Sequence, residues 1–196
     1  MLNGLTEEER VGASNEAKLL AELKYPCIIG LIESFYKEST LYIAMELCSG
    51  GDLSGIIESQ QRIRAQSKQQ DAPVNFFQEH MIMTFFIQIA LGVRYIHRRN
   101  ILHRDLKTKN IFITGDNVIK LGDFGISKVL DSTEAFARTV VGTPYYLSPE
   151  ICEGNAYSKA SDVWSLGCVL YEMVTLSHAF NGQTLPALVI TTLLKT

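Results

Sequence analysis

Hydrophobic positions recur along the chain with periods that predict both helices and strands. Residues 76–98 predict a long amphipathic helix, because apolar side chains recur there every three or four positions: Ile82, Phe86, Ile89, Val93 and Ile96. A helix is also predicted over 6–24, which starts at a capping threonine followed by three glutamates and stops before Pro26. Residues 162–175 are apolar on nearly every face, which predicts a helix buried at the centre of a domain.

The strand signals are short. Segments 28–35 and 41–47, separated by the turn KEST, predict a pair of strands, and NIFIT and VIKLG predict two more. GGDL (50–53) predicts a loop that leads into a short helix, and the glutamine-rich stretch 58–72 predicts a solvated loop. A second polar loop is predicted over 127–140. One helix, then strands, then mostly helices indicates an α+β fold.

Composition fits one globular domain. The chain has 196 residues, of which 46% are hydrophobic and 20% charged, and it can bury a sizeable core. A net charge of −3 gives no reason to expect attraction to nucleic acid or to an anionic membrane. The four cysteines form no CxxC pair, which favours a reducing compartment over a zinc site. The apolar runs are too short for a membrane span, and the first residues have no signal-peptide core.

Two motifs carry the chemistry: HRDLKTKN at 103–110 and LGDFG at 121–125. Asp105 is a candidate base for a hydroxyl proton, and Lys107 is a cation that can neutralise a moving phosphoryl group. Asn110 and Asp123 offer the oxygen ligands that Mg²⁺ prefers. His103 and Phe124 are interpreted as packing residues. Together the residues predict magnesium-assisted phosphoryl transfer.

These motifs resemble those of eukaryotic protein kinases, and several longer strings resemble the NIMA-related family of serine/threonine kinases: ELKYPCII, LYIAMELCSGGDL, HRDLKTKNIFI, VIKLGDFGISKVL, VGTPYYLSPEI and HAFNGQTLPALV. The resemblance implies a kinase-like α+β fold. Residues 1–48 would then be the remnant of the small lobe, with helix C, the following strands and the hinge. Residues 49–196 would form most of the helical large lobe, without its last helices.

The resemblance also implies an ATP and Mg²⁺ site. Glu16 would be the helix C glutamate, and Met45 the residue that gates the adenine pocket. Glu46, Leu47 and Cys48 would form the hinge. Asp52 would be the acid that reaches the ribose, and Phe112 would form the floor under the adenine. Kinases also stack a hydrophobic spine, matched here by Leu20, Leu31, His103 and Phe124. Asp162 resembles the buried acid that holds the backbone of the HRD motif.

GTPYYLSPE at 142–150 resembles the part of the activation segment that docks protein substrates. By the same resemblance Thr143 would bridge Asp105 and Lys107, and Thr139 would be a regulatory phosphosite that pairs with Arg104. Another kinase molecule would phosphorylate Thr139 in trans, and the β-branched Ile126 would favour threonine as acceptor. The family implies a cytoplasmic protein with cytoskeletal, centrosomal or ciliary association, and no nucleic-acid or membrane partner.

The sequence departs from the kinase pattern at both ends. Only Gly4 and Gly12 precede Glu16, so there is no GxGxxG, and no lysine precedes Lys18. We therefore expect a truncated domain of low activity. A catalytically inactive kinase-like module for binding or regulation remains the alternative. A nucleotide-binding domain with another acceptor is a third reading, which GTPYYLSPE disfavours because it indicates peptide docking.

Overall fold

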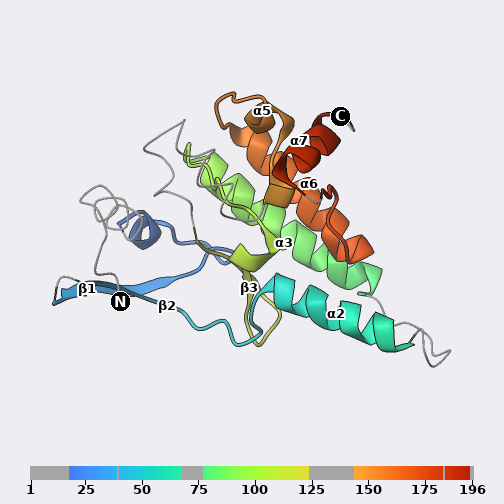
Figure 1. Ribbon diagram of the computed structural model, residues 1–196. Coiled ribbons are helices and arrows are strands. Elements are labelled where there is room, and N and C mark those ends of the chain that lie inside the picture. The colour runs from blue at the N-terminus through green and yellow to red at the C-terminus, as the bar shows by residue number, and fades with distance from the viewer. Residues whose placement is uncertain (1–17, 39, 68–76, 124–143, 183, 195–196) are drawn as a thin grey trace.

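The computed structural model describes residues 18–38, 40–67, 77–123, 144–182 and 184–194. A short helical segment, 18–22, precedes the strands β1 (Leu31–Lys37) and β2 (Thr40–Met45). Two helices, a second pair of short strands and three further helices follow, in the order α2 (Leu53–Ser67), α3 (Glu79–His97), β3 (Ile111–Ile113), β4 (Ile119–Leu121), α5 (Pro149–Cys152), α6 (Lys159–Thr175) and α7 (Leu185–Leu194). The β1–β2 hairpin lies to one side of the helices (Figure 1), and the predicted α+β class is confirmed.

The described strands form two antiparallel pairs, β1 with β2 and β3 with β4. β1 pairs with β2, and the stacked rings of Phe35 and Tyr42, 5.2 Å apart, lie across that pair. The first residues of the predicted strand 28–35 pair elsewhere, because Ile29 N donates to Leu121 O at 2.9 Å and Leu121 N donates to Cys27 O at 2.8 Å. This contact joins the N-terminal part of the chain to β4.

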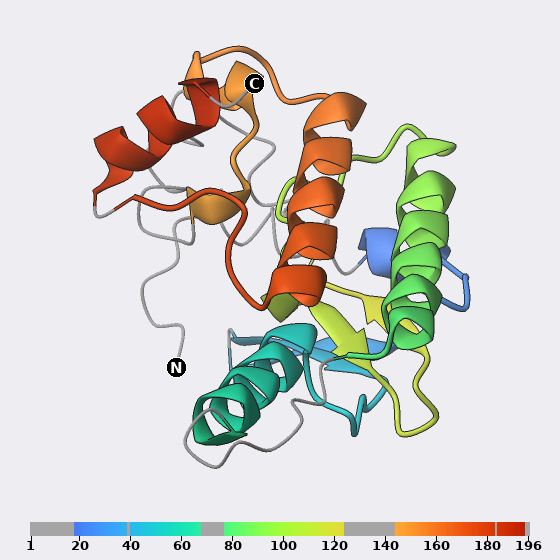
Figure 2. The same cartoon turned by 90° about the vertical axis from the view of Figure 1, so that its right-hand side faces the viewer.

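The core lies between α3, α6 and the β3–β4 pair. α3 and α6 run side by side in both views (Figures 1 and 2), and the predicted helix over 76–98 is confirmed for Glu79–His97. Gly92 allows α3 to approach β4 closely, since a Cβ atom there would lie 2.7 Å from Leu121 Cδ1 and 3.3 Å from Cys27 O. Ile89, Ile96 and Leu121 are fully buried at this contact.

The prediction of a loop over 58–72 is wrong for residues 58–67, which are the second part of α2. Glutamine, glutamate and arginine are good helix formers, so a polar composition does not exclude a helix. Leu53 and Ile57 bury one face of its first two turns, and Gln61 Nε2 donates to Leu176 O at 2.8 Å. The remaining predicted loop residues lie outside the described part of the chain.

The predicted helix over residues 162–175 is confirmed, but the prediction that it is buried on nearly every face is partly wrong. α6 begins earlier, at Lys159, behind a capping box formed by Ser158 and Ser161. Its apolar residues Val163, Tyr171 and Val174 are 56%, 46% and 54% exposed, because α3 and the segment around residue 146 cover only the opposite face. In the described residues, no helix is both long and apolar enough to cross a membrane.

Candidate active site

Asp105, Lys107 and Asn110 meet in one loop just before β3. The Lys107 Nζ atom lies 2.8 Å from Asp105 Oδ2, and each side chain is about one fifth exposed, at 18% and 21%. Asn110 Nδ2 donates to the backbone oxygen of Asp105 at 2.8 Å and to Asp105 Oδ2 at 3.1 Å. The structure therefore brings together the base, the cation and the amide that the sequence predicts, with the Asp105 carboxylate fixed from two sides.

The backbone that enters this loop is held by Asp162, on the first turn of α6. Asp162 is fully buried and accepts hydrogen bonds from the backbone nitrogens of His103 and Arg104, at 3.0 and 3.1 Å. The hydroxyl of Tyr157 and the ring of His97 also contact this carboxylate, each at 2.7 Å. Asp162 thus takes the position that the sequence predicts for it, as a carboxylate among four polar partners.

His103 is part of the core. Its side chain is completely buried, and burial lowers the pKa of the imidazole below its ordinary value, although the nearby carboxylates of Asp162 and Asp105 oppose this shift. Leu20 and Leu31, two other expected members of the spine, line a common cavity of about 310 Å³. Phe124, the fourth member, lies outside the described residues.

Asn110 and Asp123 carry the two oxygen-bearing side chains that the sequence predicts as ligands of a cation. Both hydrogen bonds to Asp105 use the Asn110 nitrogen, so the oxygen of this planar amide faces away from Asp105. Gly122 N donates to Asn110 O at 3.1 Å, which ties the backbone before Asp123 to Asn110. Asp123 is exposed and adopts a φ of 53°, an uncommon angle for a residue other than glycine. An amide oxygen and an exposed carboxylate fit a hard cation such as Mg²⁺.

The adenine side of the expected site contains an ion pair that sequence reasoning missed. Glu46 Oε1 lies 2.9 Å from Lys120 Nζ and accepts a hydrogen bond of 2.6 Å from Gly30 N. The Glu46 side chain is therefore bound to Lys120 and Gly30, and its backbone nitrogen also donates to Gly30 O, at 2.9 Å. Met45, at the end of β2, is 41% exposed, and Cys48 O accepts a tight-turn hydrogen bond from Gly51 N at 3.1 Å.

Asp52 and Phe112 lie next to each other through an isolated bridge between their backbones. Asp52 Oδ1 accepts from Gly55 N at 2.9 Å, so this carboxylate caps the start of α2. Phe112 is partly buried, and its ring closely approaches Gly122, where a Cβ atom would lie 2.9 Å from Phe112 Cε2. Only glycine fits between this ring and β4 without displacement.

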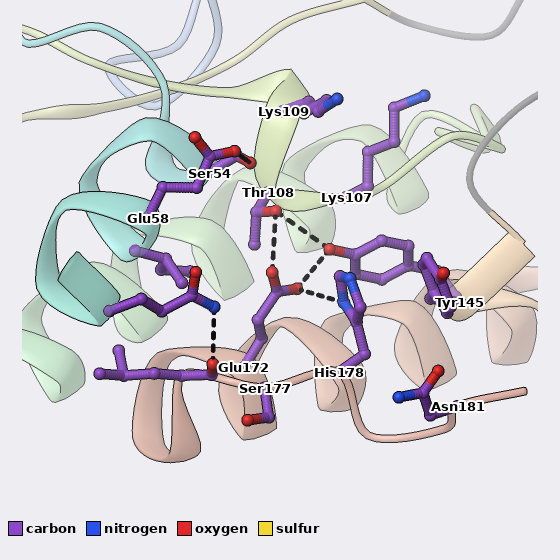
Figure 3. Close-up of a pocket in the computed structure, with 14 residues that line it drawn as sticks. Ser54, Glu58, Lys107, Thr108, Lys109, Tyr145, Glu172, Ser177, His178 and Asn181 are labelled. Atoms are coloured by element: carbon purple, nitrogen blue, oxygen red, sulfur yellow. Dashed lines mark hydrogen bonds and ion pairs between the residues drawn. The ribbon is translucent and has the colours of Figure 1, made fainter. Parts of the chain in front are cut away.

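A cavity of about 460 Å³ opens beside Lys107, between the catalytic loop, α2 and the segment after α6 (Figure 3). Figure 3 shows Thr108, Glu172 and His178 converging on its floor, and the hydroxyl of Tyr146 completes this cluster. The His178 ring stacks on Tyr145 with centroids 4.0 Å apart. Thr108, Tyr146 and His178 lie in motifs of the sequence, but nothing in the sequence indicates that they meet, because these motifs are far apart in the chain.

Several expected residues have no described position: Glu16, Phe124, Ile126, Thr139 and Thr143. Their roles stay predictions. Arg104, the expected partner of a phosphorylated Thr139, is described; it is partly buried and has a φ of 66°.

The fold and this catalytic loop define the protein kinase class. The model of the protein kinase domain matches residues 3–194, so the chain belongs to the protein kinase family. Its curated relatives include mouse serine/threonine-protein kinase Nek1, 47% identical over 96% of this chain, and Caenorhabditis elegans serine/threonine-protein kinase nekl-2, 44% identical over 95% of it. The resemblance to NIMA-related kinases is confirmed.

The structure also resembles the crystal structure of Rad53 1-466 in complex with AMP-PNP, with a TM-score of 0.72 and 30% identity over 92% of this chain. The match covers 42% of the Rad53 chain. This chain spans 15% of the length of Nek1 and 51% of the length of nekl-2. The kinase-like fold that the sequence predicts is thereby confirmed.

Proposed function

We propose that the chain is a protein serine/threonine kinase that transfers the γ-phosphoryl group of ATP to hydroxyl groups of protein substrates. The observation that carries this proposal is the placement of Lys107 Nζ and Asn110 Nδ2 on the same oxygen of Asp105, at 2.8 and 3.1 Å. A carboxylate held in this way can accept the proton of an incoming hydroxyl in one fixed direction. The relatives named as serine/threonine kinases support this choice of acceptor.

In this proposal Asp105 orients the acceptor hydroxyl and takes its proton, while Lys107 neutralises charge on the transferred group. Bound Mg²⁺ supplies positive charge to the phosphates, and the residues that would hold it are Asn110 and Asp123. The partial exposure of Asp105 and Lys107 leaves both side chains accessible to substrates.

We place the nucleotide between the hinge and Phe112. The backbone of Glu46 to Cys48 would bond the adenine edge, with Met45 behind it and Phe112 below it. Asp52 would reach the ribose with the carboxylate oxygen that does not cap α2. Glu16 would take the place of the helix C glutamate, whose partner in kinases is an ATP-binding lysine that is absent before Lys18 here. A Rad53 structure that contains AMP-PNP, an ATP analogue, supports a nucleotide site in this fold.

For regulation we propose that Thr139 is phosphorylated by a second kinase molecule and then pairs with Arg104, and that Thr143 bridges Asp105 and Lys107. The proposed partners are protein substrates, without nucleic acid or membrane, and the proposed location is the cytoplasm with its cytoskeletal structures. The test compares the activity of Thr139→Ala with that of the parent protein, before and after phosphatase treatment. Equal activity in all four measurements would count against the role of Thr139.

The test of the proposed function is transfer of radiolabelled phosphate from ATP to a dephosphorylated protein substrate in the presence of Mg²⁺. Transfer that depends on Asp105, and that yields phosphoserine or phosphothreonine, supports the kinase. Transfer that is equal in Asp105→Asn and the parent chain contradicts it. A chain that captures protein partners without any Asp105-dependent transfer would be the alternative, a kinase-like binding or regulatory module.

A further inference from the structure

We infer that Thr108 is a positioning residue of the phosphoryl-transfer site, whose buried hydroxyl ties the catalytic loop to Tyr146 and Glu172. This inference rests on the proposed function and deepens it. Thr108 opens the short 3₁₀ turn η1 (Thr108–Asn110), between Lys107 and Asn110, and is only 2% exposed. A hydroxyl at this depth needs hydrogen-bond partners, and those it has decide where the turn lies.

The direction of the hydrogen bonds follows from the number of protons available. Tyr146 donates its single hydroxyl proton to Glu172 Oε2 in a very short hydrogen bond, so the phenol oxygen can only accept from a third group. Thr108 Oγ1 lies 3.0 Å from that oxygen and therefore donates its single proton to it, while Glu172 Oε1, at 3.5 Å, is the more distant acceptor for the same proton. Burial raises the pKa of Tyr146 well above its usual range, Glu172 adds to the shift, and a donor at Thr108 opposes it.

Tyr146 and Glu172 are themselves anchored to a rigid element. Glu172 belongs to the fourth turn of α6 and is 5% exposed, and Tyr146, which ends the 3₁₀ turn η3 (Pro144–Tyr146), is 9% exposed. The backbone oxygen of Tyr146 accepts from Ser165 Oγ, also on α6, at 3.1 Å. The phenol and the backbone of Tyr146 are thus both bound to one helix, so the acceptor offered to Thr108 has a fixed position.

The same helix therefore holds the catalytic loop at two points. Asp162, near the start of α6, binds the backbone nitrogens of His103 and Arg104, on one side of Asp105. Glu172, near its end, binds Thr108 through Tyr146, on the other side of Asp105. With both sides fixed to α6, the carboxylate of Asp105 has a defined position relative to Lys107 and Asn110, which a reaction that depends on orientation needs.

The experiment compares Thr108→Val, which keeps the shape and removes the hydroxyl, with Thr108→Ser, which restores it. We expect Thr108→Val to lower kcat by roughly fivefold with the KM for ATP unchanged, and Thr108→Ser to return kcat to the parent value. Thr84→Val is the matched control, because its hydroxyl bonds within the exposed face of α3, to His80 O. A Thr108→Val protein with the kcat of Thr84→Val would overturn the inference.

A second readout does not depend on activity. Amide hydrogen exchange of residues 103–111 should be roughly fivefold faster in Thr108→Val than in Thr108→Ser, at an equal unfolding midpoint. Tyr146→Phe should give at least the same increase, because it removes the hydrogen bond from Thr108 together with the one to Glu172, and adding Thr108→Val to it should then change little. Unchanged exchange in Thr108→Val refutes the inference. If the parent chain shows no Asp105-dependent phosphate transfer, only the proposed function is refuted. The hydrogen-exchange result then still decides whether Thr108 positions the catalytic loop.

Discussion

Asp162 Oδ1 accepts a hydrogen bond of 3.1 Å from the backbone nitrogen of Arg104, a residue whose φ angle is 66°. A left-handed backbone angle is unfavourable for a residue with a side chain, so the surrounding contacts must hold it in place. The buried carboxylate does this from α6, 58 residues further along the chain. The local geometry of the catalytic loop thus depends on a distant residue, and substitutions at both ends of this contact are informative.

Asp162→Asn should lower the free energy of unfolding by about 2–4 kcal/mol, because the new amide group presents a donor to neighbours that already donate. Chemical denaturation of the purified protein measures the loss. The control is Asp116→Asn, in an exposed turn, which should stay within about 0.5 kcal/mol of the parent. Equal losses in the two variants would show that Asp162 does not stabilise the fold.

Asp105→Asn should reduce turnover by roughly 100-fold or more, because an amide cannot accept the proton of the acceptor hydroxyl. Steady-state phosphate transfer to a protein substrate measures the effect, with Asp116→Asn again as the control for the chemical change alone. A turnover that is unchanged in Asp105→Asn, in a folded protein, would remove Asp105 from the role of base.

Gly92→Ala and Gly167→Ala should have opposite effects on stability, although both glycines lie inside helices. A methyl group at Gly92 would meet Leu121 at 2.7 Å, which should reduce the free energy of unfolding by about 1–2 kcal/mol. At Gly167 nothing lies within 4 Å of the added atom, so alanine should stabilise α6 by about 0.5–1 kcal/mol. Denaturation curves compare the pair, and a stabilising Gly92→Ala would contradict the tight contact between α3 and β4.

Stability should fall as the pH is lowered through the ordinary histidine value of 6.5, because burial lowers the pKa of His103 in the folded state. The unfolded chain then binds the proton more readily than the folded protein, so this contribution is complete above 6.5 and is lost below it, by at most about 1.4 kcal/mol per pH unit. His103→Gln should flatten the dependence between pH 7.5 and 5.5, whereas His80→Gln, at an exposed position, should not. Identical slopes for the parent and His103→Gln would be the contrary result.

The features that the sequence predicts correctly depend on residues that are close together in the chain. The periodic apolar residues of α3 and the short, mainly apolar run of β2 suffice to define these elements, and the HRDLKTKN string places three polar groups on one loop. Residues such as Asp105 and Asn110 are five positions apart, so the local backbone alone brings them together. The position of Asp162 is also predicted correctly, by resemblance to a family and not by spacing.

What the sequence does not predict depends on distant partners. The glutamine-rich part of α2 has few apolar residues, and its contact with Leu176 is invisible in a local window because 115 positions separate Gln61 from it. The Glu46–Lys120 pair and the Thr108–Tyr146–Glu172 cluster likewise join separate segments. The sequence overestimates the burial of Val163, Tyr171 and Val174 in α6, because apolar composition does not say which face of a helix has a neighbour.

The contact between Gln61 and Leu176 also has a consequence for the order of folding. Leu176 ends α6 with a left-handed backbone, a φ of 58°, and its oxygen is available to Gln61 only after that helix has formed. α2 has a largely polar sequence in its second half, so on its own it gains little from becoming helical. We therefore expect α3 and α6 to pair early and the second half of α2 to become ordered late, since its stabilising contact spans more than half of the chain.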